Sequence, residues 1–190
     1  MGKFLTLVIA GLIAAATPAQ ANTLVDVSTL QASLMVEAKT LGLDWKVGDE
    51  ADYKLTIGTF IKGKSHNFVR EDVGTSLWMV QDMDLGAMGK QKMEILINKT
   101  TGAIEKLLVN GQEQQVPDAG EIEIIETKEA RITVPAGAFD CIYVKIRSSE
   151  GIQEAWLNPQ AVPMGGNLKV MADSQLGKVT QELVAAKKAE

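Results

Sequence analysis

The chain has 190 residues, of which 46% are hydrophobic and 23% are charged, and its 24 acidic and 19 basic residues give a formal net charge of −5. This is the balance of an ordinary globular protein, long enough for one domain with a core. The acidic excess disfavours nucleic acid and anionic membrane surfaces as partners, because both need a basic face.

Residues 1–21 have the pattern of a secretory signal peptide. Lys3 carries a positive charge, residues 4–16 are apolar, and Ala19-Gln20-Ala21 is a small-x-small cleavage site. The apolar run is shorter than the roughly 18 residues that a membrane span needs, and no later segment is apolar enough to span a membrane. We therefore expect cleavage after Ala21, export to the periplasm, a single β-rich domain over residues 22–184 and a polar tail over residues 185–190.

The first predicted element of the mature chain is a helix from Ser28 to Leu41. Its apolar residues recur at spacings of three and four, and Gly42 provides a stop. Such a helix buries one side only. The favoured interpretation is a fixed cover over an open side of a sheet, and a lid over an entry is the alternative.

From Trp45 onward the apolar period changes to two, which is typical of strands buried on one face. Gly63 is expected to turn the first hairpin, and Asn110-Gly111 is the strongest hairpin signal because both residues tolerate a positive φ. The segment 121–134 is ambiguous because its Glu and Lys content would suit a helix, but its β-branched residues favour a strand. Strands are expected over residues 53–62, 65–71, 76–84, 91–98, 104–109, 121–134, 142–146, 152–156, 167–171 and 178–184.

About ten short strands with turn residues between them indicate an antiparallel barrel, half-barrel or sandwich rather than a parallel sheet. We predict a mainly-β protein with a single curved antiparallel sheet, a half-barrel of about ten strands, under an N-terminal covering helix.

One segment, Gly58 to Ser65, formally matches the phosphate-loop pattern G-x-x-x-x-G-K-[ST]. That motif works only when a helix begins at the lysine, so that backbone amides face the phosphates. Phe60 and Ile61 would place bulky groups inside the loop, and the residues after Ser65 alternate like a strand. We therefore interpret the segment as a hairpin and not as a nucleotide site.

No other motif assembles a catalytic or metal site. The chain has one histidine, His66, and one cysteine, Cys141, and it lacks a Gly-x-Ser-x-Gly elbow. Asp82 and Asp84 offer too few carboxylates for a calcium loop. We expect no enzyme activity, no metal and no cofactor, and a buried, inert thiol at Cys141.

The remaining signal is apolar. Several predicted strands carry apolar residues on both faces. A sheet made of such strands must be covered on each side, or it must enclose a hydrophobic cavity. A filled core is the favoured interpretation and a cavity the alternative. If a cavity exists, we expect its apolar wall to include Trp78, Met79, Phe139, Trp156 and Leu157.

The segments Val134-Pro135-Ala136-Gly137-Ala138-Phe139-Asp140 and Trp156-Leu157-Asn158-Pro159 complete the pattern. With the export signal and the meander, the chain resembles periplasmic proteins whose sheet is similar to the lipoprotein-carrier half-barrels of the LolA/LolB type. This resemblance implies an exported binding or carrier protein for a lipid, an acyl chain or another apolar ligand. The alternative is an envelope protein-interaction or assembly factor with a protein partner and no small-molecule ligand.

Overall fold

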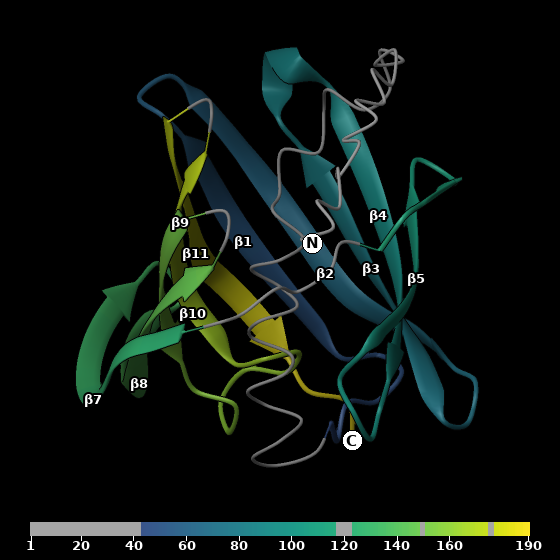
Figure 1. Cartoon of the computed structure of the whole chain (residues 1–190). Coiled ribbons are helices and arrows are strands. Elements are labelled where there is room, and N and C mark those ends of the chain that lie inside the picture. Colours follow the sequence, from purple (N-terminus) through teal and green to yellow (C-terminus); the bar gives the residue numbers. More distant parts are fainter. Residues whose placement is uncertain (1–42, 117–122, 149–150, 175–176) are drawn as a thin grey trace, which may run out of the picture.

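The described part of the chain forms one antiparallel sheet of 11 strands (Figure 1). The computed structural model describes residues 43–116, 123–148, 151–174 and 177–190. A short 3-10 helix, η2 (Gly86–Met88), lies between two of the strands. The strands are β1 (Glu50–Ile57), β2 (Ile61–Asp72), β3 (Ser76–Asp84), β4 (Lys90–Asn98), β5 (Ile104–Val109), β6 (Gln112–Gln114), β7 (Glu123–Val134), β8 (Gly137–Ser148), β9 (Gly151–Leu157), β10 (Asn167–Ser174) and β11 (Gly177–Lys187).

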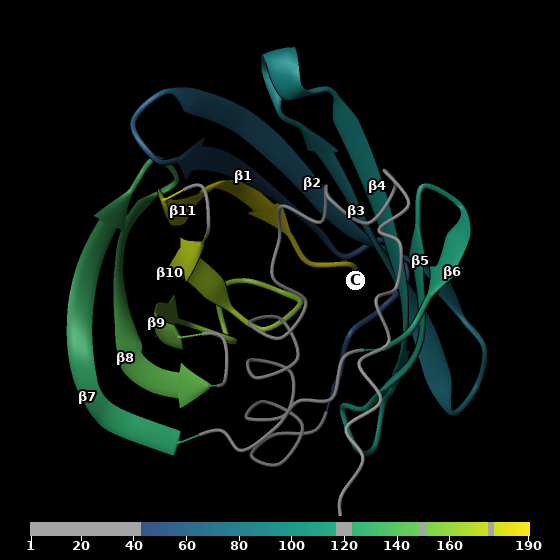
Figure 2. The ribbon, with the colours of Figure 1, turned by 45° about the horizontal axis from the view of Figure 1, so that its top comes forward.

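The order of the strands follows from local hairpins and one long-range pairing. In this sheet the order is β6-β5-β4-β3-β2-β1-β11-β10-β9-β8-β7, so β1 pairs with β11 and the two edges are β6 and β7. Figure 2 shows the strands following a curve whose two edges stay apart. The predicted single curved antiparallel sheet is confirmed, and it is not closed into a barrel.

Alternation along β1 shows how the sequence divides the sheet into two faces. Tyr53 and Leu55 are 2% and 1% exposed, whereas Asp52 and Lys54, which precede them, are exposed. Successive strand residues point to opposite faces, so one face of β1 joins the core and the other meets solvent. The largest side chains that are fully buried are Leu55, Leu77, Met79, Met83, Met93, Ile95, Ile97, Leu168, Leu183, Val80 and Val162.

The buried face also holds polar side chains that bond to one another. Gln81 Nε2 donates to Ser65 Oγ at 3.1 Å, and Ser65 Oγ donates to Asn67 Oδ1 at 2.7 Å. Buried polar groups are tolerated when they are hydrogen-bonded. This ladder therefore ties β2 to β3 within an otherwise apolar layer.

Two local predictions are confirmed. Asn110 and Gly111 have φ values of 51° and 79°, as a turn with two positive φ angles requires. The ambiguous segment is a strand, β7, paired with β8 over its length.

Several element boundaries differ from the prediction; β8, for example, spans Gly137–Ser148 and not 142–146. The first hairpin turns at 58–60 instead of at Gly63, since Gly58 has a φ of 58° and Ile57 pairs with Ile61. The predicted loop after Gly111 contains β6, because Gln112 and Gln114 extend that hairpin. β11 runs past Val184 to Lys187, since pairing with Glu50 of β1 holds residues of the expected tail.

Some predictions lie outside the described residues, namely the signal peptide 1–21, its cleavage after Ala21 and the covering helix 28–41. Within the described ranges, no helix is long and apolar enough to cross a membrane.

Candidate functional site

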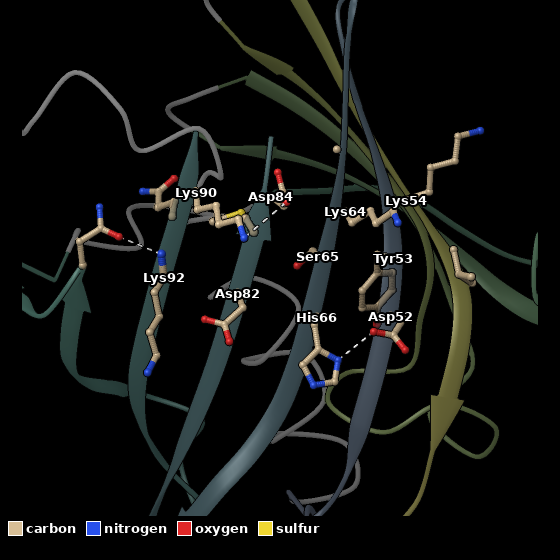
Figure 3. A pocket seen from close by; sticks show the side chains of 15 residues that line it. Asp52, Tyr53, Lys54, Lys64, Ser65, His66, Asp82, Asp84, Lys90 and Lys92 are labelled. Atoms are coloured by element: carbon tan, nitrogen blue, oxygen red, sulfur yellow. Dashed lines mark hydrogen bonds and ion pairs between the residues drawn. The ribbon is translucent and has the colours of Figure 1, made fainter. Parts of the chain in front are cut away.

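A groove of about 940 Å³ lies over the solvent-facing side of β1–β4 (Figure 3). Alternate residues of these strands point into it, while the residues between them, such as Tyr53 and Met83, belong to the core. The acidic, basic and imidazole side chains lining the groove are Asp52, Lys54, Lys64, His66, Asp82, Asp84, Lys90 and Lys92.

The register places half of these side chains in one row across four strands. Asp52 lies opposite His66, His66 opposite Asp82, and Asp82 opposite Lys92. His66 Nδ1 and Asp52 Oδ1 are 2.8 Å apart, and a carboxylate only accepts, so the imidazole donates. Each aspartate of this row therefore lies beside a hydrogen-bond donor or a cation, and such complementary cross-strand pairs are favourable in an antiparallel sheet.

The neighbouring row contains an unfavourable contact. Lys54 lies directly opposite Lys64, and Lys64 lies opposite Asp84. Asp84 interacts instead with Lys90, whose Nζ is 3.9 Å from a carboxylate oxygen. In the part of the chain described above, neither Lys54 nor Lys64 has a carboxylate within 4.0 Å. On its other side Lys54 lies opposite Glu182 of β11, which pairs with Lys169 at 3.0 Å. Like charges directly opposite destabilise a sheet, and the carboxylates that flank this pair are both engaged with other lysines.

Four lysines and three aspartates line the groove, and its Lys54–Lys64 end is where an anion could bind. Its two free ammonium groups sit on neighbouring strands, and lysine methylenes can contact apolar parts of a ligand while the charged ends reach its anionic groups. Among the residues that the structure describes, no group of three His, Cys, Asp or Glu side chains could hold a metal ion.

The five predicted apolar wall residues do not share one surface. Met79 is 1% exposed in the main core, whereas its neighbour Trp78 faces the other side under Arg70, with the guanidinium carbon 5.0 Å from the ring centroid. Trp156 packs against the main core and Leu157 against a second cluster formed by Val144 and Ile146. The structure therefore does not bring the five into a single wall, because consecutive strand residues point in opposite directions.

Phe139 and Trp156 remain on the same face, and both pack against the main core. The ring centroids of Trp156 and Tyr143 are 5.1 Å apart. Each ring also has a lysine beside it: Lys169 Nζ is 5.9 Å from the Trp156 centroid, and Lys128 Nζ is 4.9 Å from the Tyr143 centroid. Lys169 also pairs with Glu182 at 3.0 Å. This part of the predicted wall is a mixed aromatic and cationic surface rather than a purely apolar one.

The predicted buried cysteine is confirmed. Cys141 is 9% exposed, and its Sγ donates to the carbonyl of Ala130 at 3.4 Å. Burial, with a smaller contribution from the charge of Asp140, raises the pKa of the thiol. A raised pKa keeps the thiol protonated and weakly reactive.

The sequence analysis missed Lys54 and Lys64 as a site. The signal that could have found them is the alternation of β1 and β2, which places both lysines on the solvent face. Placing the turn at Gly63 put Lys64 in a loop and hid the pairing. With the turn at 58–60, the two lysines face one another.

The comparisons with known proteins show a fold and no family. No protein-family model matches the sequence, and no curated protein matches it significantly. A hypothetical protein of Chlamydia trachomatis, CT021, has a similar structure with a TM-score of 0.52 and 9% identity, over 84% of this chain and 92% of that one. MucB, in its complex with MucA from Pseudomonas aeruginosa, gives a TM-score of 0.50 and 10% identity over 87% of this chain.

The chain spans 58% of the length of the MucB chain that it matches. At such identities the likeness concerns the fold alone. It agrees with the antiparallel half-barrel expected from the resemblance to the lipoprotein carriers.

Proposed function

We propose that this protein is an exported, non-enzymatic binding module of the periplasm that holds an acidic segment of an envelope protein in the β1–β4 groove. The observation that carries the proposal is the Lys54–Lys64 pair, which is exposed, faces a groove and has no carboxylate partner in the described structure. A carboxylate from a partner would lie between the two ammonium groups and relieve their repulsion.

The negative charge of the whole chain does not oppose this binding. At physiological salt, charges more than about 8 Å apart are largely screened. An approaching acidic segment therefore responds to the lysines of the groove and much less to the net charge of −5. Lys90 and Lys92 on the opposite wall are engaged with Asp84 and Glu94 at 3.9 Å and 3.8 Å, distances long enough for their ammonium groups to turn towards a ligand.

The structural likeness lends support of a general kind. The MucB structure that resembles this chain was solved together with MucA, so a sheet of this shape occurs in a protein that forms a protein complex. The expected partner is an extended segment that carries neighbouring Asp or Glu residues.

The test is binding of a fluorescent acidic peptide, measured by anisotropy at several salt concentrations. The variant Lys54→Glu/Lys64→Glu should weaken binding about 10-fold, because two charge contacts of roughly 0.5–1 kcal/mol each are lost. The matched control is Lys46→Glu/Lys178→Glu, which changes the net charge equally at exposed residues outside the groove.

Equal weakening by both double variants would show that the peptide responds to net charge alone and would refute the groove. In cells, a photo-crosslinking residue at position 92 should capture an envelope protein from the native chain and not from the Lys54→Glu/Lys64→Glu variant. Capture that is unaffected by those substitutions would place the partner elsewhere.

Carriage of a lipid or other apolar ligand stays a prediction. The methionines of the buried face are closely packed, with Met79 and Met93 at 1% and 0% exposure. Native mass spectrometry of protein from its own periplasm, before and after organic extraction, tests the carrier directly. Extra mass that disappears on extraction would favour it over the protein-binding module.

A further inference from the structure

Among the described residues, strand β7 forms a long open edge of the sheet. It has 12 residues and pairs only with β8 in the strand order, at the outer side of the curve in Figures 1 and 2. Most of its side chains, including Thr127, Glu129, Arg131 and Thr133, are exposed. An edge of this length offers backbone N–H and C=O groups to another strand, and proteins usually shield such edges.

The register shows which residues of β7 offer these groups. Ala130 lies opposite Cys141, and its carbonyl accepts from the Cys141 thiol, so it points towards β8. The direction alternates along an antiparallel strand. Thr127, Glu129, Arg131 and Thr133 therefore direct their backbone groups away from β8, and their side chains lie on one face of the sheet.

We propose that β7 pairs antiparallel with β7 of a second copy of this chain, around a two-fold axis at Ala130. In this register Glu129 lies opposite Arg131 of the other copy, and Thr127 lies opposite Thr133. The symmetry repeats each pair, so all four outward-directed residues meet a complementary partner. Opposite charges and Thr–Thr pairs are both favourable across antiparallel strands.

The residue on the axis suits this geometry. Ala130 would lie opposite its own copy at a position where the two residues exchange no hydrogen bonds and the chains approach most closely. A methyl group fits there without a clash. A two-fold interface of this kind uses the same surface on both subunits, which is the commonest arrangement in homo-oligomers.

Neighbouring registers are worse. An axis at Glu129 or at Arg131 places like charges against each other, and an axis at Lys128 opposes two lysines. An axis at Ile132 brings Glu129 opposite Pro135, which has no N–H to donate. The register centred on Ala130 is the one in which the exposed face of β7 complements itself.

The charged residues are available for the contact. In the described structure Glu129 takes part in no ion pair, and Arg131 has only a 3.5 Å contact with Asp140 between side chains that are 72% and 84% exposed. The groove lies on β1–β4, separated from β7 by β11, β10, β9 and β8 in the strand order. Pairing at β7 therefore leaves the groove free, and the two proposals can fail separately.

The first test uses charge reversal and mixing, read by sedimentation velocity over a concentration series. Glu129→Arg alone and Arg131→Glu alone each set like charges against each other twice, and each should weaken dimerisation at least about 10-fold. An equimolar mixture of the two single variants should dimerise again, because every opposed pair then joins an acid to a base. A native chain that stays monomeric at high concentration, or a mixture that is no better than either variant, would overturn the proposal.

The second test uses a thiol on the axis. Because Cys141 lies across from Ala130 within one chain, the background is Cys141→Ser. In that background Ala130→Cys should form an intermolecular disulfide on mild oxidation, since the two α-carbons would be about 4.5 Å apart. Thr133→Cys, whose opposite residue is Thr127, should not. Equal crosslinking of both variants would indicate random collision and would count against the two-fold register.

Discussion

Gly63 should be one of the least replaceable glycines in the chain, although its backbone is ordinary. Its φ angle is not positive, and it lies within β2 where that strand meets the end of β3. A Cβ at this position would lie 2.6 Å from the backbone oxygen of Asp84 and 3.1 Å from Leu85 Cδ2. Taking about 3.3 Å as a close ordinary carbon–oxygen contact, Gly63→Ala must separate the two strands by roughly 0.7 Å.

The magnitude follows from two opposing terms. Alanine restricts the unfolded chain and on that account should stabilise the protein by about 0.4–1 kcal/mol. Overpacking a closely packed site costs about 1–3 kcal/mol. We expect a net decrease of about 1–2 kcal/mol in the free energy of unfolding, or about 2–8 °C in Tm for a domain of this size.

The assay is urea unfolding followed by tryptophan fluorescence, with Gly111→Ala as the comparison. Gly111 has a φ of +79°, and a Cβ added to it would meet no atom within 4 Å, so its loss reflects backbone strain alone. Only Gly63→Ala should disturb the amide signals of Asp84 and Leu85 in NMR spectra. A Gly63→Ala variant as stable as the native chain would refute the close approach of β2 to that carbonyl.

Two further predictions concern aromatic side chains. Burial, and then the charge of Asp52, raises the pKa of Tyr53; above about pH 10 the unfolded chain loses a proton that the folded chain keeps, so stability should fall as pH rises. Tyr53→Phe should flatten this alkaline decrease, measured by urea unfolding between pH 9 and 11, about one unit on either side of the free tyrosine pKa. Equal slopes for the two proteins would contradict the reasoning. Trp156→Ala should lower the free energy of unfolding by about 2–3 kcal/mol and Trp78→Ala by about 1 kcal/mol, because only Trp156 packs against the main core. The reverse order in urea titrations would place Trp78 in the core instead.

Much of the fold could be predicted from local patterns. Alternation identified most of the strands and the face that each one buries, as in Tyr53 and Leu55 against Asp52 and Lys54. Asn110-Gly111 identified its hairpin because positive φ at two successive residues strongly restricts the choice of side chain. These are properties of a few neighbouring residues, so no tertiary contact is needed to read them.

The first hairpin shows where local patterns fail. Gly58 and Gly63 both fit a turn, and the alternation of apolar residues does not distinguish them. In the structure Ile57 pairs with Ile61, so the turn lies at Gly58. Gly63 lies within the strand, where a side chain would clash with the backbone carbonyl of Asp84 on the next strand. The error mattered for the site, since the pairing of Lys54 with Lys64 depends on that turn. The five predicted wall residues lie on different faces for a simpler reason, because Trp78 and Met79, like Trp156 and Leu157, are consecutive strand residues.

The sequence by itself determined a mainly-β chain, its strand faces and the absence of a recognisable catalytic motif, because these depend on side-chain type and spacing. Only the tertiary structure decided that β1 pairs with β11 and that β7 is left at an edge. Those outcomes depend on contacts between residues more than a hundred positions apart, such as Glu50 with Lys187. Neither local propensity nor alternation carries information about such contacts, and the open edge at β7 arises from them. The Lys54–Lys64 pair depends instead on the position of the first hairpin turn.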